Sequence, residues 1–362
     1  MADRSLHIAI DGRELVGKPT GVGRYVHGMM TQWAAGSPHR YTVVVPAEPP
    51  PALRSLGERF TWLVVPADVA GTWWEQVHLP RALGRIAPDV LFAPAYTAPL
   101  RPTPPVVVVI HDVSFFAHPE WFRWREGVRR RFVTRHTARR ARTVITVSAF
   151  SQSEIERYLG VPSHRIALAP AGAPIAETTP PTARPPLVLY VGSLFNRRHV
   201  LGMIQAFARI APDLPSAKLV LVGDNRTSPR QDPQAIAREC GVAQQVEWRA
   251  YATDAELRDL YRSARVFLFL SDYEGFGIPP LEAFAHGVPA VVLDTPVSRE
   301  VYAEGAIGVS ADPADIAAAT RRLLTDDGAH AAAVAAGRAR LSAYSWARSA
   351  AVITRALEEA AR

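Results

Sequence analysis

Short apolar runs without polar alternation recur along this chain, and they constrain its fold more than any other feature. Strand-like runs occupy residues 6–11, 41–45, 60–65, 90–92, 106–110, 143–147, 187–192, 218–222, 266–270 and 290–293. Helical patterns separate them at 22–35, 73–86, 151–159, 201–210, 255–263, 280–285 and, last, 346–361. Such runs suit strands that are buried on both faces of a parallel sheet. The alternation therefore predicts an α/β protein with doubly wound, Rossmann-like sheets.

A proline-rich stretch interrupts the alternation at residues 171–186. It reads AGAPIAETTPPTARPP and holds five prolines with few large apolar side chains, a composition typical of an extended linker. With 362 residues, the chain is also long for one domain. We predict an N-terminal domain over 1–180, a C-terminal domain over 187–345 and a final helix over 346–362. The two domains are expected to face each other across a cleft.

The positive charge is concentrated in one segment. The net charge is +7, whereas residues 122–142 alone contribute +8, with nine arginines and one acid, Glu126. A near-neutral protein with one basic patch is not expected to bind nucleic acid. The same segment carries an apolar stripe made of Trp121, Trp124, Val128 and Phe132. Two interpretations stay open: segment 123–142 contacts an anionic membrane, or it is a surface helix packed by its first half.

The sequence gives no sign of export or of membrane insertion. It has no run of about 18 apolar residues, and its first residues, MADRSLHIAIDGREL, include acids and no long apolar core. Its single cysteine, Cys240, excludes an internal disulfide framework and a cysteine-rich metal site. We expect a cytoplasmic protein.

The stretch DYEGFGIPPLE, residues 272–282, follows a predicted strand and is the strongest candidate site. Ligands of open α/β sheets bind at the carboxyl ends of strands. Gly275 and Gly277 permit close backbone approach, and the two prolines suit the first turn of a helix, whose N-terminus attracts phosphate. Glu274 in the loop and Glu282 in the first helical turn can each bind a sugar diol. The alternative is a helix start whose acids compensate its dipole, worth about 0.3–1 kcal/mol each.

These residues carry a family resemblance. The sequence EGFGIPPLE, with the AFAHGVPAV that follows it, is similar to the E-x7-E signature of retaining GT-B glycosyltransferases of family 4. Further matches follow in order along the chain: TGVGRY at 20–25, HD at 111–112, VSAFS at 147–151, YVGSLFNRRHV at 190–200 and LVG at 221–223. The resemblance implies the GT-B fold, with an acceptor-binding domain, a donor-binding domain and a C-terminal helix that crosses back to the N-terminal domain.

The resemblance also implies roles for single residues. It makes Glu274, His111 and Arg198 the catalytic candidates: Glu274 lies at the donor hexose, His111 beside the same sugar, and Arg198 in place of a lysine at the diphosphate. Glu282 resembles the ribose ligand. In the donor-binding set, Gly21, Val22 and Gly23 resemble a glycine loop for the diphosphate, and Asn225 lies near the base. The other members of the set are Arg197, Arg198, Gly275, Phe276, Gly277, Ile278 and Glu282.

The chemistry of these side chains is consistent with the implied roles, but for some residues an alternative interpretation stays open. Arginine suits a leaving diphosphate, because it forms bidentate bonds to phosphate and stabilises developing negative charge. Either Arg197 or Arg198 can make this contact, and the alternative is solvated charge at a helix start. For His111 the alternative is a satisfied histidine at a strand end. No D-x-D triplet occurs, and neither lysine lies in a loop that resembles a pyridoxal phosphate site. We expect no metal and no cofactor.

The sequence therefore predicts a retaining, metal-independent glycosyltransferase. It would transfer a hexose from a nucleoside-diphosphate sugar to a saccharide or lipid-linked acceptor in bacterial polysaccharide assembly. GDP-mannose is favoured, because TGVGRYV and EGFGIPPLE most resemble mannosyltransferases. UDP-glucose or another donor with a small natural-product acceptor stays open, as do a sugar-nucleotide epimerase and a non-catalytic sugar-nucleotide-binding protein.

Overall fold

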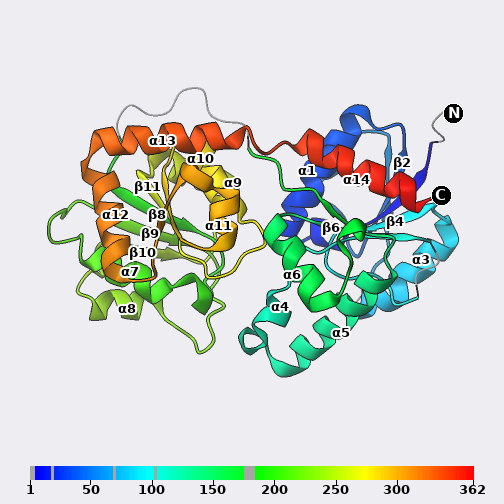
Figure 1. The fold of residues 1–362 in the computed structure, drawn as a ribbon, viewed down its shortest axis with the longest axis horizontal. Helices are drawn as coiled ribbons and strands as arrows, with labels where there is room; N and C mark the ends of the chain where they lie inside the picture. The colour runs from blue at the N-terminus through cyan, green and yellow to red at the C-terminus, as the bar shows by residue number, and fades with distance from the viewer. Residues whose placement is uncertain (1–4, 18–19, 68–70, 102–103, 175–183) are drawn as a thin grey trace. The chain divides into compact units, whose positions relative to one another are not determined.

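Two compact units make up the chain in this computed structural model, which describes residues 5–17, 20–67, 71–101, 104–174 and 184–362. The first unit comprises residues 1–172 and 345–362, and the second comprises residues 173–344 (Figure 1). Most of the predicted linker, residues 175–183, lies outside the described residues.

The first unit is built on a seven-stranded parallel sheet in the order β3-β2-β1-β4-β5-β6-β7. Its strands are β1 (His7–Asp11), β2 (Arg40–Val45), β3 (Phe60–Val64), β4 (Val90–Ala93), β5 (Val106–Val109), β6 (Thr143–Thr146) and β7 (Ile166–Leu168). Its longer helices are α1 (Gly21–Gly36), α3 (Leu79–Ile86), α5 (Trp124–Arg140), α6 (Ala149–Leu159) and α14 (Trp346–Ala360), joined by the short helices α2 (Pro51–Arg54) and α4 (Ser114–Ala117). β1 pairs with both β2 and β4. The strand order therefore reverses between β1 and β4, where open sheets bind ligands.

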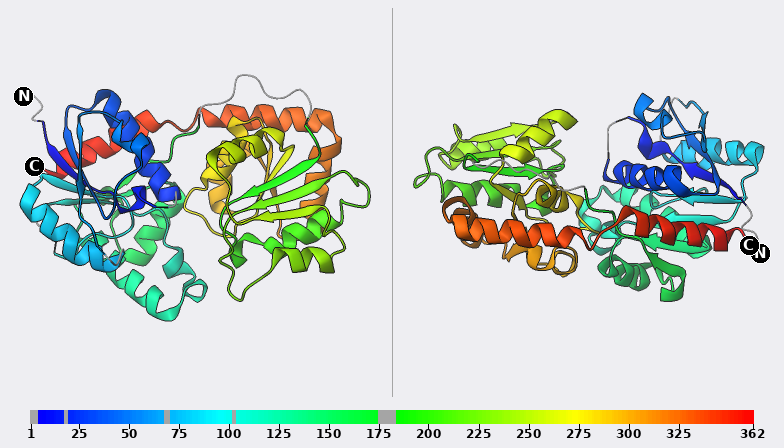
Figure 2. Two further views of the ribbon diagram at one scale, coloured as in Figure 1. Left: turned by 180° about the vertical axis from the view of Figure 1, so that it is seen from behind. Right: turned by 90° about the horizontal axis from the view of Figure 1, so that it is seen from above.

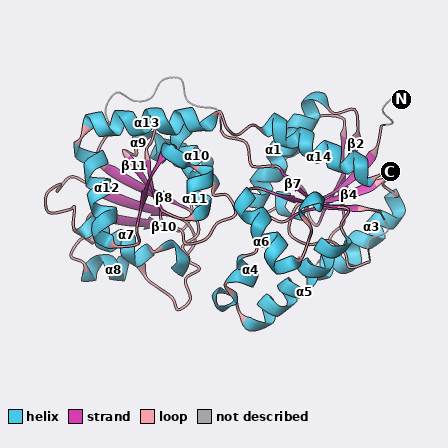
Figure 3. Ribbon diagram, in the orientation of Figure 1, coloured by secondary structure: helices cyan, strands magenta, loops and turns pink. Residues whose placement is uncertain are grey.

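The second unit repeats this plan with six strands in the order β10-β9-β8-β11-β12-β13. Its strands are β8 (Leu187–Val191), β9 (Lys218–Val222), β10 (Val246–Arg249), β11 (Val266–Phe269), β12 (Ala290–Leu293) and β13 (Ala306–Val309). Its helices are α7 (Val200–Ala208), α8 (Pro233–Glu239), α9 (Asp254–Ser263), α10 (Ile278–Ala285), α11 (Pro296–Val301), α12 (Pro313–Thr325) and α13 (Asp327–Leu341). Each sheet carries helices on both faces (Figure 3), which confirms the predicted α/β class.

The last helix, α14, packs within the first unit beside α1 (Figure 2). Trp33 Nε1 donates to Thr354 Oγ1 at 3.0 Å, and His39 Nε2 lies 3.0 Å from Glu358 Oε1. Ser349 Oγ also donates to the Pro170 carbonyl at 2.6 Å. The chain thus returns to its N-terminal unit, as predicted for the terminal helix.

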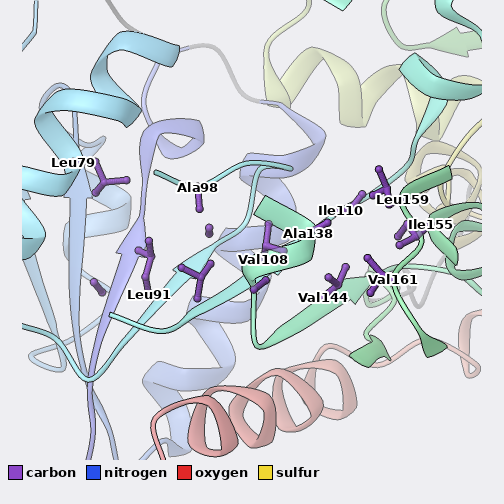
Figure 4. Packing of buried hydrophobic residues seen from close by; sticks show 14 of the residues in the cluster. Leu79, Leu91, Ala98, Val108, Ile110, Ala138, Val144, Ile155, Leu159 and Val161 are labelled. Atoms are coloured by element: carbon purple, nitrogen blue, oxygen red, sulfur yellow. The ribbon is translucent and has the colours of Figure 1, made fainter. Parts of the chain in front are cut away.

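One apolar cluster of the first unit lies between its sheet and helices α3, α5 and α6 (Figure 4). Leu91, Val108 and Val144 from three neighbouring strands are fully buried. They belong to one apolar cluster with Ala138 of α5 and Ile155 of α6. Each buried valine, leucine or isoleucine contributes about 1.5–3 kcal/mol, so this cluster holds the strands of the first unit in place, including β5, which precedes His111.

Three strands have no counterpart in the sequence prediction: β7, β10 and β13. All three lie at the edge of their sheet, and each leaves at least half of its residues partly exposed. An edge strand need not be apolar throughout, and β10, which reads VEWR, lacks the continuous run that marks a central strand. β7 reads IAL and β13 reads AIGV, so both are apolar but only three and four residues long. The helix predicted at 73–86 also differs, because it contains a π-helical turn at Trp74–His78 before α3 begins.

Candidate functional site

Arg198 and Glu274 form a bonded pair at the carboxyl ends of β8 and β11. Arg198 donates from Nε and Nη2 to Glu274 Oε1, at 3.1 and 2.7 Å. Its Nη1 donates to the Ser193 carbonyl at 3.0 Å and reaches the Tyr190 hydroxyl at 3.4 Å. Burial is the largest single influence and lowers the pKa of Arg198, but the charge and hydrogen bonds of Glu274 and Tyr190 together outweigh it, so the pKa is raised. Arg198 is therefore a fixed cation directly beside the acid.

One oxygen of Glu274 anchors this carboxylate. Besides the two bonds from Arg198, Oε1 accepts a hydrogen bond from Ser271 Oγ at 2.9 Å. No hydrogen bond reaches Oε2 from the part of the chain that the structure describes. A carboxylate oxygen can accept two hydrogen bonds, so Oε2 can bind a ligand hydroxyl while Oε1 keeps the side chain in place.

The loop from Gly275 to Gly277 is shaped by Tyr302, a residue that the sequence analysis did not single out. Gly277 has φ +82°, and a Cβ there would lie 2.2 Å from the Tyr302 hydroxyl. That hydroxyl donates to the Gly277 carbonyl at 2.8 Å. The Phe276 side chain is buried and meets Tyr344 edge-on, with ring centroids 4.9 Å apart. Phe276 therefore anchors the loop by its side chain, and only its backbone is placed to meet a ligand.

The helix α10 begins at Ile278, two residues earlier than predicted. Gly277 precedes it in the left-handed conformation, and prolines occupy its first turn. Glu282 consequently lies in the second turn, which corrects the prediction of a first-turn acid. The dipole alternative fails for the same reason, because the first turn of α10 holds no acid. Glu282 Oε2 accepts a hydrogen bond from the Tyr261 hydroxyl at 3.0 Å.

The other predicted donor residues of this unit have local contacts. Arg197 stacks over the Phe195 ring, with 4.3 Å between its guanidinium carbon and the ring centroid. Asn225 organises its own loop: its Nδ2 donates to the Gln231 carbonyl at 2.6 Å, and its Oδ1 accepts from Thr227 N and Oγ1 at 3.1 and 2.7 Å. Within this unit, the structure joins Arg198 to Glu274 and gives Arg197 and Asn225 other partners.

His111 follows β5 in the first unit and is held from several sides. Its Nε2 lies 2.9 Å from the Pro94 carbonyl, which can only accept, so Nε2 carries the hydrogen. Burial lowers the pKa of His111, so the ring is neutral near pH 7 and Nδ1 is a hydrogen-bond acceptor. Ser151, from the VSAFS segment, donates to the His111 carbonyl at 3.0 Å. The rings of Tyr25 and Tyr96 pack at 5.1 and 5.5 Å.

Gly21, Val22 and Gly23 form the first turn of α1, not a loop as predicted. Thr20 caps the helix, and its Oγ1 accepts from Gly23 N at 2.9 Å. A Cβ on Gly23 would lie 2.4 Å from the Glu14 carbonyl oxygen, so this glycine permits close packing against the turn that follows β1. The 16-residue helix presents an N-terminus, which is a general feature for binding anions.

A buried charge network at the end of β1 was not foreseen. Arg13 Nη2 lies 2.9 Å from Glu75 Oε1, 3.2 Å from Asp11 Oδ2 and 3.2 Å from Thr97 Oγ1. Burial raises the pKa of Asp11 to about 6, because it outweighs the opposing charge of Arg13. The position of Asp11 at the carboxyl end of β1 could have marked it as a site residue from the sequence. The contact with Glu75 could not have been predicted, because 64 positions separate it from Asp11.

The described residues lack two kinds of feature. They contain no group of three or more His, Cys, Asp or Glu side chains arranged to hold a metal ion. None of the helices that the structure describes has both the length and the apolar content needed to span a membrane.

Comparison with known proteins extends these observations. A family model described as Glycosyltransferase Family 4 matches residues 19–177, and one described as Glycosyl transferases group 1 matches residues 175–340. O-antigen chain mannosyltransferase B of Escherichia coli is 30% identical over 257 residues, which cover 66% of each chain. O-antigen chain mannosyltransferase RfbU of Salmonella typhimurium is 27% identical over 205 residues, covering 57% of this chain and 56% of that protein. The matched stretch thus spans about two thirds or less of the length of these relatives.

The solved structure of Anabaena HepE in complex with UDP and glucose has the same fold. It superimposes with a TM-score of 0.75 at 18% identity, over 98% of this chain and 99% of that one. The two parallel-sheet units therefore define a protein of the GT-B fold. With the two family models, which together span residues 19–340, the chain belongs to the family 4 glycosyltransferases.

Proposed function

We propose that this protein is a retaining, metal-independent hexosyltransferase that uses a nucleoside-diphosphate sugar, with GDP-mannose favoured. It would transfer the hexose to a saccharide or lipid-linked acceptor in bacterial glycan assembly. One observation carries the proposal: the Arg198 cation and the Glu274 carboxylate are bonded to each other at the ends of two neighbouring strands. Such an adjacent cation and acid can bind a sugar phosphate, the cation at its phosphate and the acid at its hydroxyls.

Arg198 and Glu274 would have different roles in the reaction. Arg198 stabilises the negative charge that gathers on the departing diphosphate. Glu274 orients the hexose through Oε2 and does not attack it. The acceptor hydroxyl enters on the face from which the diphosphate departs and passes its proton to a diphosphate oxygen. This order retains the anomeric configuration without a covalent sugar–enzyme intermediate.

Other residues would complete donor binding. Glu282 is the ribose ligand in this proposal, and the backbone from Gly275 to Ile278 lies at the hexose. His111, neutral and with Nδ1 as an acceptor, would bind a sugar hydroxyl. The amides of Gly21 and Val22 at the start of α1 would contribute to diphosphate binding. Metal independence is proposed because the sequence lacks a D-x-D triplet.

Mannose is favoured because relatives are named as O-antigen mannosyltransferases. UDP-glucose is the alternative donor, since structures with the same fold are titled as complexes with UDP-glucose or with UDP and glucose. A lipid-linked acceptor agrees with an enzyme that works in the cytoplasm at the inner face of the plasma membrane.

Donor hydrolysis and product analysis test this function. The purified protein would be incubated with GDP-mannose, UDP-glucose and related donors without acceptor, and the products followed by chromatography and proton NMR. Slow release of nucleoside diphosphate and of a free sugar first formed as the α-anomer is expected for one donor. No thermal stabilisation by any of the nucleotides would contradict the donor site. A changed sugar still attached to nucleotide would instead identify an epimerase.

A further inference from the structure

Helix α5 packs with its small residues and leaves its large apolar residues exposed. Its buried face consists of Gly127, Val133, Thr134, Thr137 and Ala138. In contrast, Trp124, Val128 and Phe132 are 76%, 42% and 63% exposed. These three lie four positions apart and therefore share one face of the helix. The interpretation of a surface helix packed by its first half does not hold for these three side chains, whereas Trp121, the first residue of the stripe, is partly buried and stacks on His118 with ring centroids 3.9 Å apart.

A fourth large apolar side chain lies close to α5. Trp73, at the start of the helical segment before α3, is 62% exposed. The residue before it, Thr72, accepts a hydrogen bond from Arg129 of α5, which brings this segment against the helix. Single exposed apolar side chains are common, but large ones gathered together mark a docking surface.

Arginines flank the exposed apolar residues. Arg123, Arg125, Arg129, Arg139 and Arg140 are all exposed. Over the parts of the chain that the structure describes, no ion pair joins any arginine of 123–142 to an acid. The neighbouring Arg130 serves a different purpose, since its guanidinium lies over the rings of Phe115 and Tyr96 at 5.2 and 5.4 Å. Arg135 and Arg142 are exposed too, and Arg135 lies over the Phe116 ring. The five exposed arginines named first therefore keep their charge available for a partner.

We propose that this surface, formed by Trp73, Trp124, Val128 and Phe132 with the five exposed arginines, docks on an anionic lipid bilayer (α5 in Figure 1). The arginines are distributed along α5, from Arg123 just before its first residue to Arg140 at its last, which suits a broad, uniformly negative plane of headgroups. Tryptophan and phenylalanine insert at the boundary between headgroups and acyl chains. The proposal deepens the proposed function, because a lipid-linked acceptor would be met at this membrane.

Vesicle sedimentation tests the docking surface with the full-length protein. Binding is expected to vesicles of phosphatidylcholine with phosphatidylglycerol, and to weaken as salt is raised, with little binding to phosphatidylcholine alone. The variant R125Q/R139Q should lower the partition coefficient about 25-fold, from about fivefold for each arginine near the surface. The control R238Q/R322Q removes two exposed arginines from α8 and α12 and should bind like the parent protein.

A second variant tests the apolar contribution. W124S/F132S should bind anionic vesicles weakly and keep its melting temperature, because both side chains are already exposed. Equal binding to both kinds of vesicle, or unchanged binding of both variants, would overturn the proposal, as would specific capture of an acidic protein with no vesicle binding. Donor hydrolysis separates the two hypotheses: its persistence without vesicle binding refutes the docking surface alone, and its absence with vesicle binding refutes the catalytic proposal alone.

Discussion

Replacing Arg198 by glutamine tests the pair on which the candidate site depends. The change removes the cation and both hydrogen bonds to Glu274 Oε1. The Glu274 side chain is only 18% exposed, so its charge loses its partner in a poorly solvated place. Breaking a fully buried pair costs about 3–5 kcal/mol. Since Glu274 keeps its bond from Ser271 and some solvent contact, we expect a loss of about 2–4 kcal/mol in unfolding free energy.

A double-mutant cycle with Glu274→Gln isolates the interaction. Urea denaturation of R198Q, E274Q and R198Q/E274Q should show a coupling energy of about 1–3 kcal/mol, with the double variant more stable than the two single losses predict. Arg238→Gln, at an exposed position on α8, is the control and should change stability by less than about 0.5 kcal/mol. If the two single losses of stability sum to the loss in the double variant to within about 0.5 kcal/mol, the pairing is refuted.

The same variants separate stability from catalysis. Because Arg198 is proposed to stabilise the departing diphosphate, R198Q should lower donor turnover by about 100-fold or more and weaken binding of free nucleoside diphosphate. Glu274→Gln should lower turnover and leave nucleoside diphosphate affinity nearly unchanged. Calorimetric titration that found equal losses of affinity for both variants would contradict the assigned roles.

Three further changes probe other parts of the molecule. Glu282→Ala should weaken nucleotide binding by about 1–3 kcal/mol in calorimetric titration, through lost ribose hydrogen bonds, and unchanged affinity would remove Glu282 from the site. Gly192→Ala should reduce turnover, because its Cβ would lie 2.6 Å from Arg198 Nη1; Gly202→Ala, whose Cβ would lie 3.6 Å from the nearest atom, should not. Asp11→Asn should alter the pH dependence of stability. Because burial raises the pKa of Asp11 from 3.8 to about 6, the folded state holds this proton more tightly than the unfolded chain does. Its contribution is therefore present below about pH 4 and lost as pH rises through about 6. Relative to the parent protein, the variant should gain about 3 kcal/mol between pH 4 and 7, and a constant difference in urea denaturation would contradict the shift.

The central strands were predictable from sequence because both of their faces are buried. β5 reads VVVV, and all four residues are buried; burial on two faces leaves no place for a polar residue, so the strand is visible as an unbroken apolar run. The edge strand β10 reads VEWR and is largely half-exposed or exposed. Its composition is compatible with several structures, and its pairing with β9 is what makes it a strand.

The site was predictable in part, for a similar reason. Glu274 became a candidate because it follows an apolar run that ends at the ligand-binding edge of a sheet, and Arg198 because the segment 190–200 resembles the family's, with Arg197 left as the alternative. Their bond joins positions 76 residues apart, and the hydroxyl of Tyr302 that shapes Gly277 comes from 25 residues further along. A local sequence pattern does not predict such contacts, because they join residues that come together only when the strands align.

Helix α5 illustrates the difference between what the sequence determines and what only the tertiary structure decides. The spacing of Trp124, Val128 and Phe132 determined that they share one face of a helix, because a residue four positions on lies nearly one full turn away. It did not determine which face would pack. The fold buries the adjoining face, where Gly127, Thr134 and Ala138 allow the helix to approach the sheet closely. The large apolar side chains are consequently exposed, and only the tertiary structure shows that this stripe is available to a partner.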